Sequence, residues 1–154
     1  MRDNKTPDHD QHWMAIALEQ AMLAKEQGEV PIGACLVSQQ RLISSAYNQT
    51  ITHTDPCAHA EILCLRQAAK SIGNHRLVQT TLYVTLEPCM MCLGAMITAR
   101  IDRVVYACKD SRVGIISKHD THKTEGLNHH LICEQGPLSD VCGDLLKNFF
   151  AQRR

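Results

Sequence analysis

Apolar residues near the N-terminus recur every three or four positions between about Asp8 and Gln27. This spacing is typical of a helix with one wide apolar face. The residues on that face are Trp13, Met14, Ile16, Ala17, Leu18, Ala21, Met22 and Ala24. Lys25 suits the negative end of the helix dipole, and Gly28 suits the position after the last turn. The polar residues up to about position 9 predict a flexible N-terminal tail.

Short runs rich in β-branched and aromatic residues alternate with further helical patterns along the rest of the chain. The predicted strands are 34–37, 42–47, 81–86 and 103–108, with a weaker one at 131–133, and the predicted helices are 58–71 and 89–98. Pro88 falls where a first-turn proline is tolerated. A last helix carries apolar residues at spacing four, namely Val141, Leu145 and Phe149, and Cys142, Leu146 and Phe150. Strands separated by helices predict an α/β fold with parallel pairing and helices on both faces of the sheet.

The segment from Ser111 to His130 follows neither a helical nor a strand period. It is polar and holds the histidines His119, His122, His129 and His130. A loop this long in a small domain is usually functional or disordered. His119 and His122 could contribute to a second metal site, but no carboxylate or thiolate cluster accompanies them. The segment is therefore interpreted as a solvated loop.

Length and charge narrow the kinds of protein that this chain can be. A chain of 154 residues is expected to form one domain, spanning 1–154. The formal net charge is zero, and the aromatic residues are one Trp, three Tyr and two Phe. Proteins that coat long tracts of nucleic acid usually have a basic surface and several stacking aromatic side chains. The composition argues against that class, but it is compatible with a pocket that receives a single base.

Eight cysteines are spread along the chain. The polar stretch from Met1 to Gln11 gives no sign of a secretory signal peptide, and no apolar run is long enough to suggest a membrane span. We therefore expect a reducing, cytoplasmic setting in which disulfides are rare. Apart from the Cys89–Cys92 pair, the cysteines are expected to be small buried apolar residues.

Two short motifs carry the candidate chemistry, His59-Ala60-Glu61 and Pro88-Cys89-Met90-Met91-Cys92. One imidazole and two thiolates suit three corners of a tetrahedral zinc site, which leaves the fourth corner for water. Glu61, two residues past the histidine, could move protons without binding the metal. Because Cys89 and Cys92 are three residues apart at a helix start, their sulfurs point to the same side, where the helix dipole favours thiolate.

A Cys-x-x-Cys pair is also typical of redox sites and of structural zinc sites. A redox pair would sit in a thioredoxin-like strand context and would need neither His59 nor Glu61. A closed structural zinc site would need a fourth protein ligand, for which only isolated cysteines are available. The histidine, the glutamate and the proline together favour an open, hydrolytic zinc site.

His-x-Glu followed by Pro-Cys-x-x-Cys is the signature of zinc deaminases. The longer stretches 55–62 and 82–96 closely resemble the bacterial tRNA-specific adenosine deaminases. So do Gly28-Glu29-Val30-Pro31-Ile32-Gly33-Ala34 and the C-terminal Asn148-Phe149-Phe150 with Arg153-Arg154. The likeness extends from about Asp10 to the C-terminus.

This resemblance implies a cytidine-deaminase-like, three-layer α/β/α fold with a mixed five-stranded sheet. It also implies one zinc ion per subunit on His59, Cys89 and Cys92, with Glu61 as the catalytic proton carrier. The family's substrate-binding positions correspond to Asn48, Val30, Ala60, Pro88 and Asp110. The implied partners are the anticodon arm of tRNA, deaminated at its wobble adenosine, and a second copy of the chain in a homodimer. No membrane partner is expected.

The chain departs from the family pattern after Asp110. Ser111-Arg112-Val113-Gly114-Ile115-Ile116-Ser117-Lys118 places bulky isoleucines where small residues are usual and where the loop is expected to lie near RNA and the dimer partner. A local basic rim for phosphates is nevertheless available in Lys109, Arg112, Lys118, Lys123, Arg153 and Arg154. Two other functions stay open, a deaminase of free nucleobases or nucleosides such as cytosine or guanine, and a non-enzymatic RNA-binding module stabilised by zinc.

Overall fold

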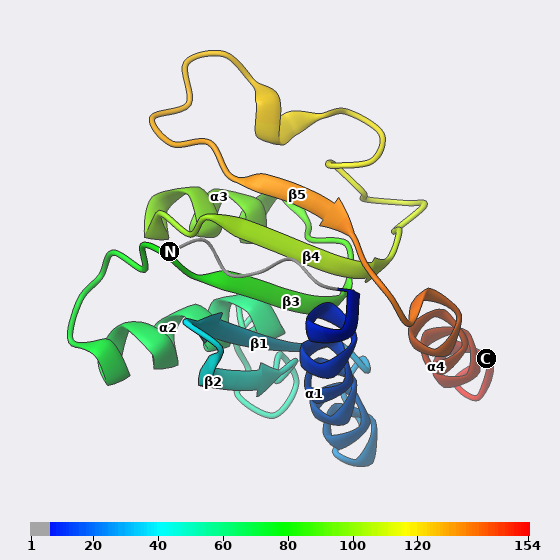
Figure 1. Ribbon diagram of the computed structural model, residues 1–154. Helices are drawn as coiled ribbons and strands as arrows, with labels where there is room; N and C mark the ends of the chain where they lie inside the picture. The colour runs from blue at the N-terminus through cyan, green and yellow to red at the C-terminus, as the bar shows by residue number, and fades with distance from the viewer. Residues whose placement is uncertain (1–6) are drawn as a thin grey trace.

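The computed structural model describes residues 7–154, which form four helices and five strands joined by loops (Figure 1). The helices are α1 (Pro7–Glu26), α2 (Ala60–Ile72), α3 (Met90–Ala99) and α4 (Ser139–Ala151), with a short 3-10 turn η1 (Thr121–Lys123). The strands are β1 (Gly33–Ser38), β2 (Arg41–Tyr47), β3 (Thr81–Leu86), β4 (Arg103–Cys108) and β5 (Ile132–Gln135). Each predicted helix and strand is present, with ends shifted by at most two residues. Within the described residues, no helix is long and apolar enough to span a membrane.

The five strands form one mixed sheet in the order β2-β1-β3-β4-β5. β3, β4 and β5 are parallel, whereas β1 is antiparallel to both of its neighbours. The expectation of parallel pairing is therefore wrong for β1. The two-residue turn at Gln39 and Gln40, both with positive φ, accounts for the β1–β2 pair, because it folds these strands into a hairpin. The mixed five-stranded sheet implied by the family resemblance is confirmed.

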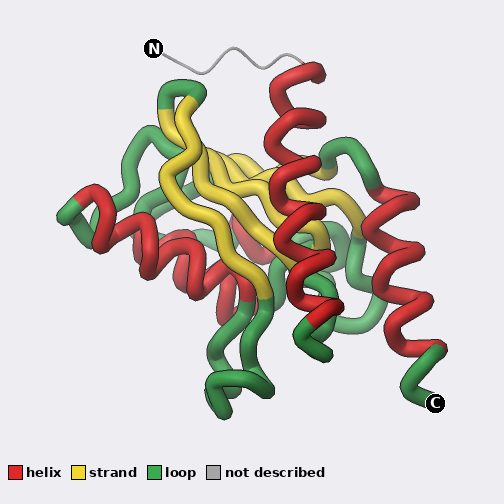
Figure 2. Tube along the Cα trace, turned by 90° about the horizontal axis from the view of Figure 1, so that it is seen from below, coloured by secondary structure: helices red, strands yellow, loops and turns green. Residues whose placement is uncertain are grey.

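Side chains of the central strands alternate between two cores, one on each face of the sheet. Leu36, Leu82 and Val104 lie in the core beneath α2 and α3. Their neighbours Cys35, Tyr83 and Val105 lie in the core beneath α1 and α4. Figure 2 shows the two helix layers on opposite sides of the strands. The fold therefore has the three α/β/α layers that were expected.

Helix α1 lies unusually close to β1, and this closeness decides which of its residues are buried. A Cβ on Gly33 would lie 2.0 Å from the carbonyl oxygen of Ala17, so only glycine fits there. The buried residues of α1 are correspondingly small apart from one methionine; they are Met14, Ala17, Ala21 and Ala24. Met22, which was expected on the apolar face, is 51% exposed. The face of α1 that packs against the sheet is therefore narrower than the sequence pattern predicts.

The N-terminal end of α1 is tied to the sheet, which corrects the expected length of the tail. The helix begins at Pro7, so residues 8 and 9 are helical, and residues 1–6 lie outside the described part of the chain. Asp10 accepts hydrogen bonds from Arg103 at 2.9 and 2.8 Å and from the Tyr83 hydroxyl at 2.8 Å. These contacts anchor the first turn of the helix to β3 and β4.

The segment between β4 and β5 is irregular, as expected, but it is not simply solvated. Ile115 and Ile116 are 8% and 4% exposed and belong to the core that includes Ile97 and Leu131. His122 is also buried. The isoleucines that depart from the family pattern therefore point into the protein, which corrects the interpretation of this segment as a solvated loop.

Candidate metal centre and active site

The start of α2 and the start of α3 supply the candidate metal ligands. His59 and Cys89 are the N-cap residues of these helices, both in extended conformation, and neither side chain caps its helix. Their side chains are therefore free for another partner. The helices begin one or two residues later than predicted, so Pro88 precedes the N-cap of α3 and is not a first-turn proline. Unpaired N–H groups and the dipoles of both helices favour negative charge here.

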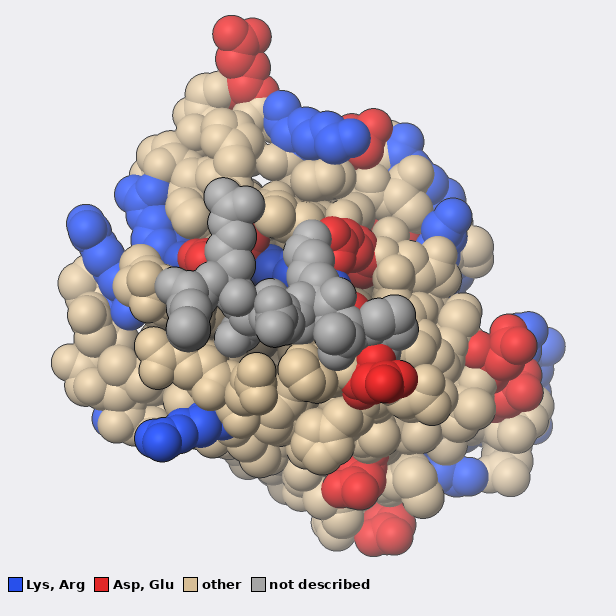
Figure 3. Space-filling model, viewed as in Figure 1, with Lys and Arg blue, Asp and Glu red and all other residues tan. Residues whose placement is uncertain are grey.

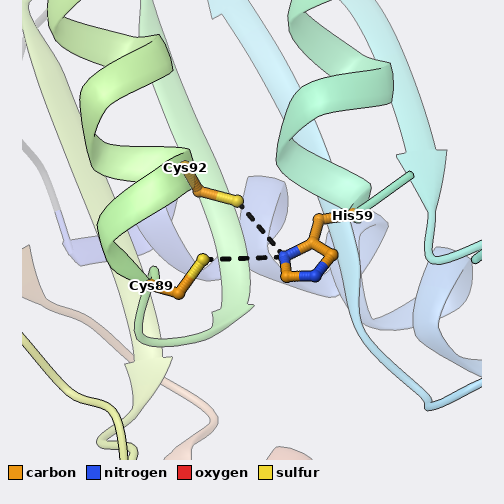
Figure 4. Close-up of side chains that lie close together, drawn as sticks. All are labelled: His59, Cys89 and Cys92. Carbon is orange, nitrogen blue, oxygen red and sulfur yellow. Dashed lines mark hydrogen bonds between the residues drawn. The ribbon is translucent and has the colours of Figure 1, made fainter. Parts of the chain in front are cut away.

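His59, Cys89 and Cys92 converge on one point, with their candidate ligand atoms all within 4.8 Å of one another (Figure 4). The Nδ1 atom of His59 lies 3.7 Å from Sγ of Cys89 and 3.4 Å from Sγ of Cys92. Tetrahedral zinc, bonded to sulfur at about 2.3 Å and to nitrogen at about 2.0–2.1 Å, holds these atoms about 3.6 Å apart. The donor set and its spacing therefore fit zinc with three protein ligands. It is the only group of three such side chains among residues 7–154, so His119 and His122 form no second site there.

The two sulfurs are not equivalent. A hydrogen bond with Cys92, together with one from His59, lowers the pKa of Cys89 to about 4. The same hydrogen bond with Cys89, together with burial, raises the pKa of Cys92. The hydrogen bond with Cys89 also raises the pKa of His59. The lowered pKa of Cys89 favours the thiolate, which is the form that binds zinc.

Glu61 lies in the first turn of α2 and is 4% exposed. Burial raises the pKa of its carboxyl group, and the side chains of Cys92 and His59 lie close enough to act on it. Glu61 lies beside the candidate metal ligands but outside the ligand set, as expected from the sequence. A buried carboxyl group next to a metal site is well suited to carry protons.

Asn48, directly after β2, is 6% exposed and is fixed by the start of α2. Its Oδ1 accepts a hydrogen bond from the backbone N–H of Ala60 at 2.8 Å. Ala60 is fully buried, and Pro88 is buried beside Cys89. The structure thus brings Asn48 and Ala60 into direct contact one residue from His59.

The two remaining expected substrate positions have other contacts. Val30 is half-buried and packs against the core on the α1 side of the sheet. Asp110 uses its Oδ1 atom to accept hydrogen bonds from the N–H groups of Arg112 and Val113 at 2.9 and 3.2 Å. Asp110 therefore shapes the turn that follows β4.

Two further buried glutamates, Glu29 and Glu87, were not expected from the sequence. Glu29 is fully buried and accepts hydrogen bonds from Ile51 N–H and from both the N–H and the hydroxyl of Thr52. Burial raises its pKa, but these hydrogen bonds outweigh burial and leave the pKa below its ordinary value. Glu87 is 3% exposed and binds the loop after β4. An acidic residue flanked by apolar residues and proline, as in Gly-Glu-Val-Pro and Leu-Glu-Pro, was the available signal.

The residues of the expected basic rim are all exposed; they are Lys109, Arg112, Lys118, Lys123, Arg153 and Arg154. The guanidinium of Arg153 lies 4.2 Å from the Phe149 ring centre and donates to the carbonyl of Gly28. That of Arg112 lies 5.8 Å from the Phe150 ring centre. On the face shown in Figure 3, basic and acidic side chains are interspersed, in keeping with the zero net charge.

Comparison with known proteins agrees with this geometry. A protein-family model described as MafB19-like deaminase matches residues 8–154. The tRNA-specific adenosine deaminase of Buchnera aphidicola subsp. Schizaphis graminum is 44% identical over 149 residues, which cover 96% of this chain and 97% of that protein.

Solved structures of deaminases are also similar to this chain. One, from a study of A-to-I editing by tRNA:A34 deaminases at the wobble position of transfer RNA, superposes with a TM-score of 0.85. It is 37% identical and covers 88% of this chain and 99% of its own. A guanine deaminase from Nitrosomonas europaea superposes with a TM-score of 0.74 at 25% identity, covering 90% of this chain and 83% of its own. The chain belongs to the tRNA-specific adenosine deaminase family.

Proposed function

We propose that this protein deaminates adenosine to inosine at the wobble position of a tRNA anticodon, with water as the nucleophile and ammonia as the second product. The observation that carries the proposal is the convergence of His59, Cys89 and Cys92 within 4.8 Å, with buried Glu61 beside them. The 44% identity to a tRNA-specific adenosine deaminase supports the choice of substrate.

His59, Cys89 and Cys92 would hold one zinc ion per subunit. When bound, zinc supplies Lewis-acid activation of water near neutral pH. The protein's own contribution to binding is a set of ligands gathered from two helix starts, and the lowered pKa of Cys89 favours its thiolate form. The side-chain amide of Asn48 helps to position this set, because it holds the N–H of Ala60, next to His59.

Glu61 is the proton carrier in this proposal. Its carboxylate takes a proton from the attacking water and delivers it to N1 of the adenine ring, while oxygen adds at C6. It then takes the remaining proton from the oxygen now bonded to C6 and passes it to the amino group, so that the C6–N bond breaks, ammonia leaves and the C6 carbonyl of inosine forms. The Glu61 side chain is itself buried, which limits the access of bulk water to the protons that it carries.

The base is held by the residues around the ligand set. The Oδ1 atom of Asn48 is engaged by Ala60, so its NH₂ group is the donor left for an acceptor on the base edge. Pro88, Val30 and the His59 ring are proposed as the walls of the pocket. Asp110 keeps its second carboxylate oxygen for a polar contact with the neighbouring nucleotide.

Free bases are the competing substrates, and the structural likeness to a guanine deaminase is the observation that favours them. The experiment that separates the two offers purified protein an anticodon stem-loop with a wobble adenosine, alongside free guanine and cytosine. Inosine in the stem-loop without turnover of the free bases is expected. Turnover of a free base with an unmodified stem-loop would instead establish the alternative.

A homodimer and a cytoplasmic setting complete the proposal. The support for the dimer is the family resemblance, in which the RNA-binding cleft is completed across two subunits. Light scattering at working concentration is expected to give twice the mass of the 17.2 kDa chain, and a monomer mass would reject the dimer. The eight cysteines, all free in the structure, suit a reducing compartment.

A further inference from the structure

Glu87 is a buried carboxylate with no part in the ligand set or in the proton transfers assigned to Glu61. It lies between the end of β3 and Pro88, so it immediately precedes the turn that delivers Cys89. Only 3% of it is exposed, and no Lys or Arg forms an ion pair with it within residues 7–154. A buried charge in this setting must be stabilised by hydrogen bonds.

Those hydrogen bonds all come from the segment 110–117. The Oε1 atom of Glu87 accepts from Asp110 N–H at 3.2 Å and from the Ser117 hydroxyl at 2.7 Å. The Oε2 atom accepts from the N–H groups of Ile116 and Ser117 at 3.0 and 2.9 Å. One carboxylate thus holds both ends of an eight-residue loop.

The packing of Gly114, Ile115 and Ile116 also holds the loop close to the Glu87 carboxylate. A Cβ on Gly114 would lie 2.7 and 2.8 Å from the two carboxylate oxygens of Glu87, so glycine is required where the loop passes over them. Ile115 and Ile116 anchor the same turn in the core. In addition, the backbone N–H of Glu87 donates to the carbonyl of Cys108, at the end of β4.

The position of the loop links it to the substrate side of the site. β3 and β4 are parallel and Leu86 pairs with Cys108, so the segments that follow them leave the sheet at the same edge. Ligands of open α/β sheets bind at this carboxyl edge. One segment carries Cys89, and the other carries Asp110 and Arg112, which are expected to face RNA.

We propose that Glu87 is a positioning residue, whose carboxylate fixes the RNA-facing segment 110–117 against the turn that delivers the metal ligand Cys89. The segment 110–117 and the Cys89 turn are then held in a fixed arrangement before RNA binds. The RNA-facing part of this inference rests on the proposed function, whereas the fixing of the loop does not.

The test compares wild-type protein with Glu87→Gln, Ser117→Ala and the control Glu19→Gln, an exposed acid on α1. Each carboxylate oxygen of Glu87 accepts two hydrogen bonds. Whichever oxygen the amide nitrogen of Glu87→Gln replaces, two of these hydrogen bonds are therefore lost. Ser117→Ala removes one hydrogen bond only, and it carries the test alone if Glu87→Gln does not fold. The readouts are zinc content, hydrogen exchange of 110–117, and KM and kcat on the anticodon stem-loop.

We expect KM to rise roughly tenfold in Glu87→Gln and roughly threefold in Ser117→Ala, with kcat within about twofold, because hydrogen bonds to a charged group are lost. Zinc content should be unchanged, exchange of 110–117 should accelerate, and Glu19→Gln should match wild type. Unchanged KM and unchanged exchange in the zinc-loaded variants would overturn the inference. So would a loss of zinc and kcat at constant KM, which would make Glu87 a support of the metal site alone. If wild type itself forms no inosine, the proposed function fails, and the exchange measurement still decides whether Glu87 fixes the loop.

Discussion

The side-chain oxygen of Asn48 accepts a hydrogen bond from the backbone N–H of Ala60 at 2.8 Å, which links the end of β2 to the first residue of α2. This single contact places the amide expected to bind the substrate one residue from the candidate metal ligand His59. It also satisfies one of the N–H groups that a helix start leaves unpaired. Asn48 therefore has a structural role in addition to its proposed substrate-binding role, and two substitutions separate them.

Asn48→Asp keeps the oxygen that accepts from Ala60 but removes the NH₂ donor. We expect its stability to stay within about 1 kcal/mol of wild type, because a carboxylate also suits a helix N-terminus. Asn48→Ala leaves a buried N–H unpaired and should cost about 1–3 kcal/mol. Urea unfolding measures both values. Deamination should fall at least tenfold in both variants, and full activity of Asn48→Asp would show that the amide does not hold the base.

Zinc binding should stabilise the fold, because the ligands join segments 33 residues apart. With free zinc at about 1,000 times Kd, the gain is about 4 kcal/mol, or roughly 10 °C in Tm for a domain of this size. Thermal unfolding with and without a chelator, followed by zinc re-addition, measures the shift. A melting temperature that is the same with and without metal would contradict the fit of these three ligands to zinc.

Gly33→Ala should destabilise the protein by about 1–3 kcal/mol or more, because its Cβ would overlap the backbone of α1. Gly143→Ala is the matched control, since its Cβ would meet nothing within 4 Å on α4. Gly143→Ala should stabilise the protein by about 0.5–1 kcal/mol, because alanine is a better helix former than glycine. Chemical unfolding measures both, and equal effects at the two positions would refute the close α1–β1 approach.

The contribution of Glu29 to stability should depend on pH. Its pKa in the folded protein lies below the ordinary 4.5, so the stabilisation is present above that value and is lost as the pH falls through the lower, folded-state pKa. The free energy of unfolding of wild type should therefore exceed that of Glu29→Gln at pH 7, and the difference should shrink in acid below pH 4.5. A difference that is constant from pH 7 to pH 3 would show that the hydrogen bonds to Thr52 and Ile51 do not depend on the charge.

The sequence predicts the elements and the ligand set well, because both follow from local patterns. Strand alternation, helical spacing and the two short motifs each lie within a few residues. The contacts of Glu29 with Thr52 and of Glu87 with Ser117 span 23 and 30 residues, so no local pattern contains them.

The remaining errors have equally physical causes. The burial of Ile115 and Ile116 was missed because an irregular segment can bury side chains without any period. The exposure of Met22 was missed because a wide apolar face does not say which of its edges meets the sheet. The antiparallel direction of β1 depends on a turn of two glutamines at positive φ, a conformation that glycine and asparagine usually supply.

The most direct test of the account is the deamination of a wobble-adenosine stem-loop by wild type and by Glu61→Gln, with zinc content measured on the same samples. Glu61→Gln keeps the size of the side chain but cannot carry protons. We expect it to retain one zinc per chain and to form inosine at least about 100-fold more slowly, in line with the loss of a general acid–base group. A zinc-loaded Glu61→Gln protein that forms inosine at the wild-type rate would contradict the central claim.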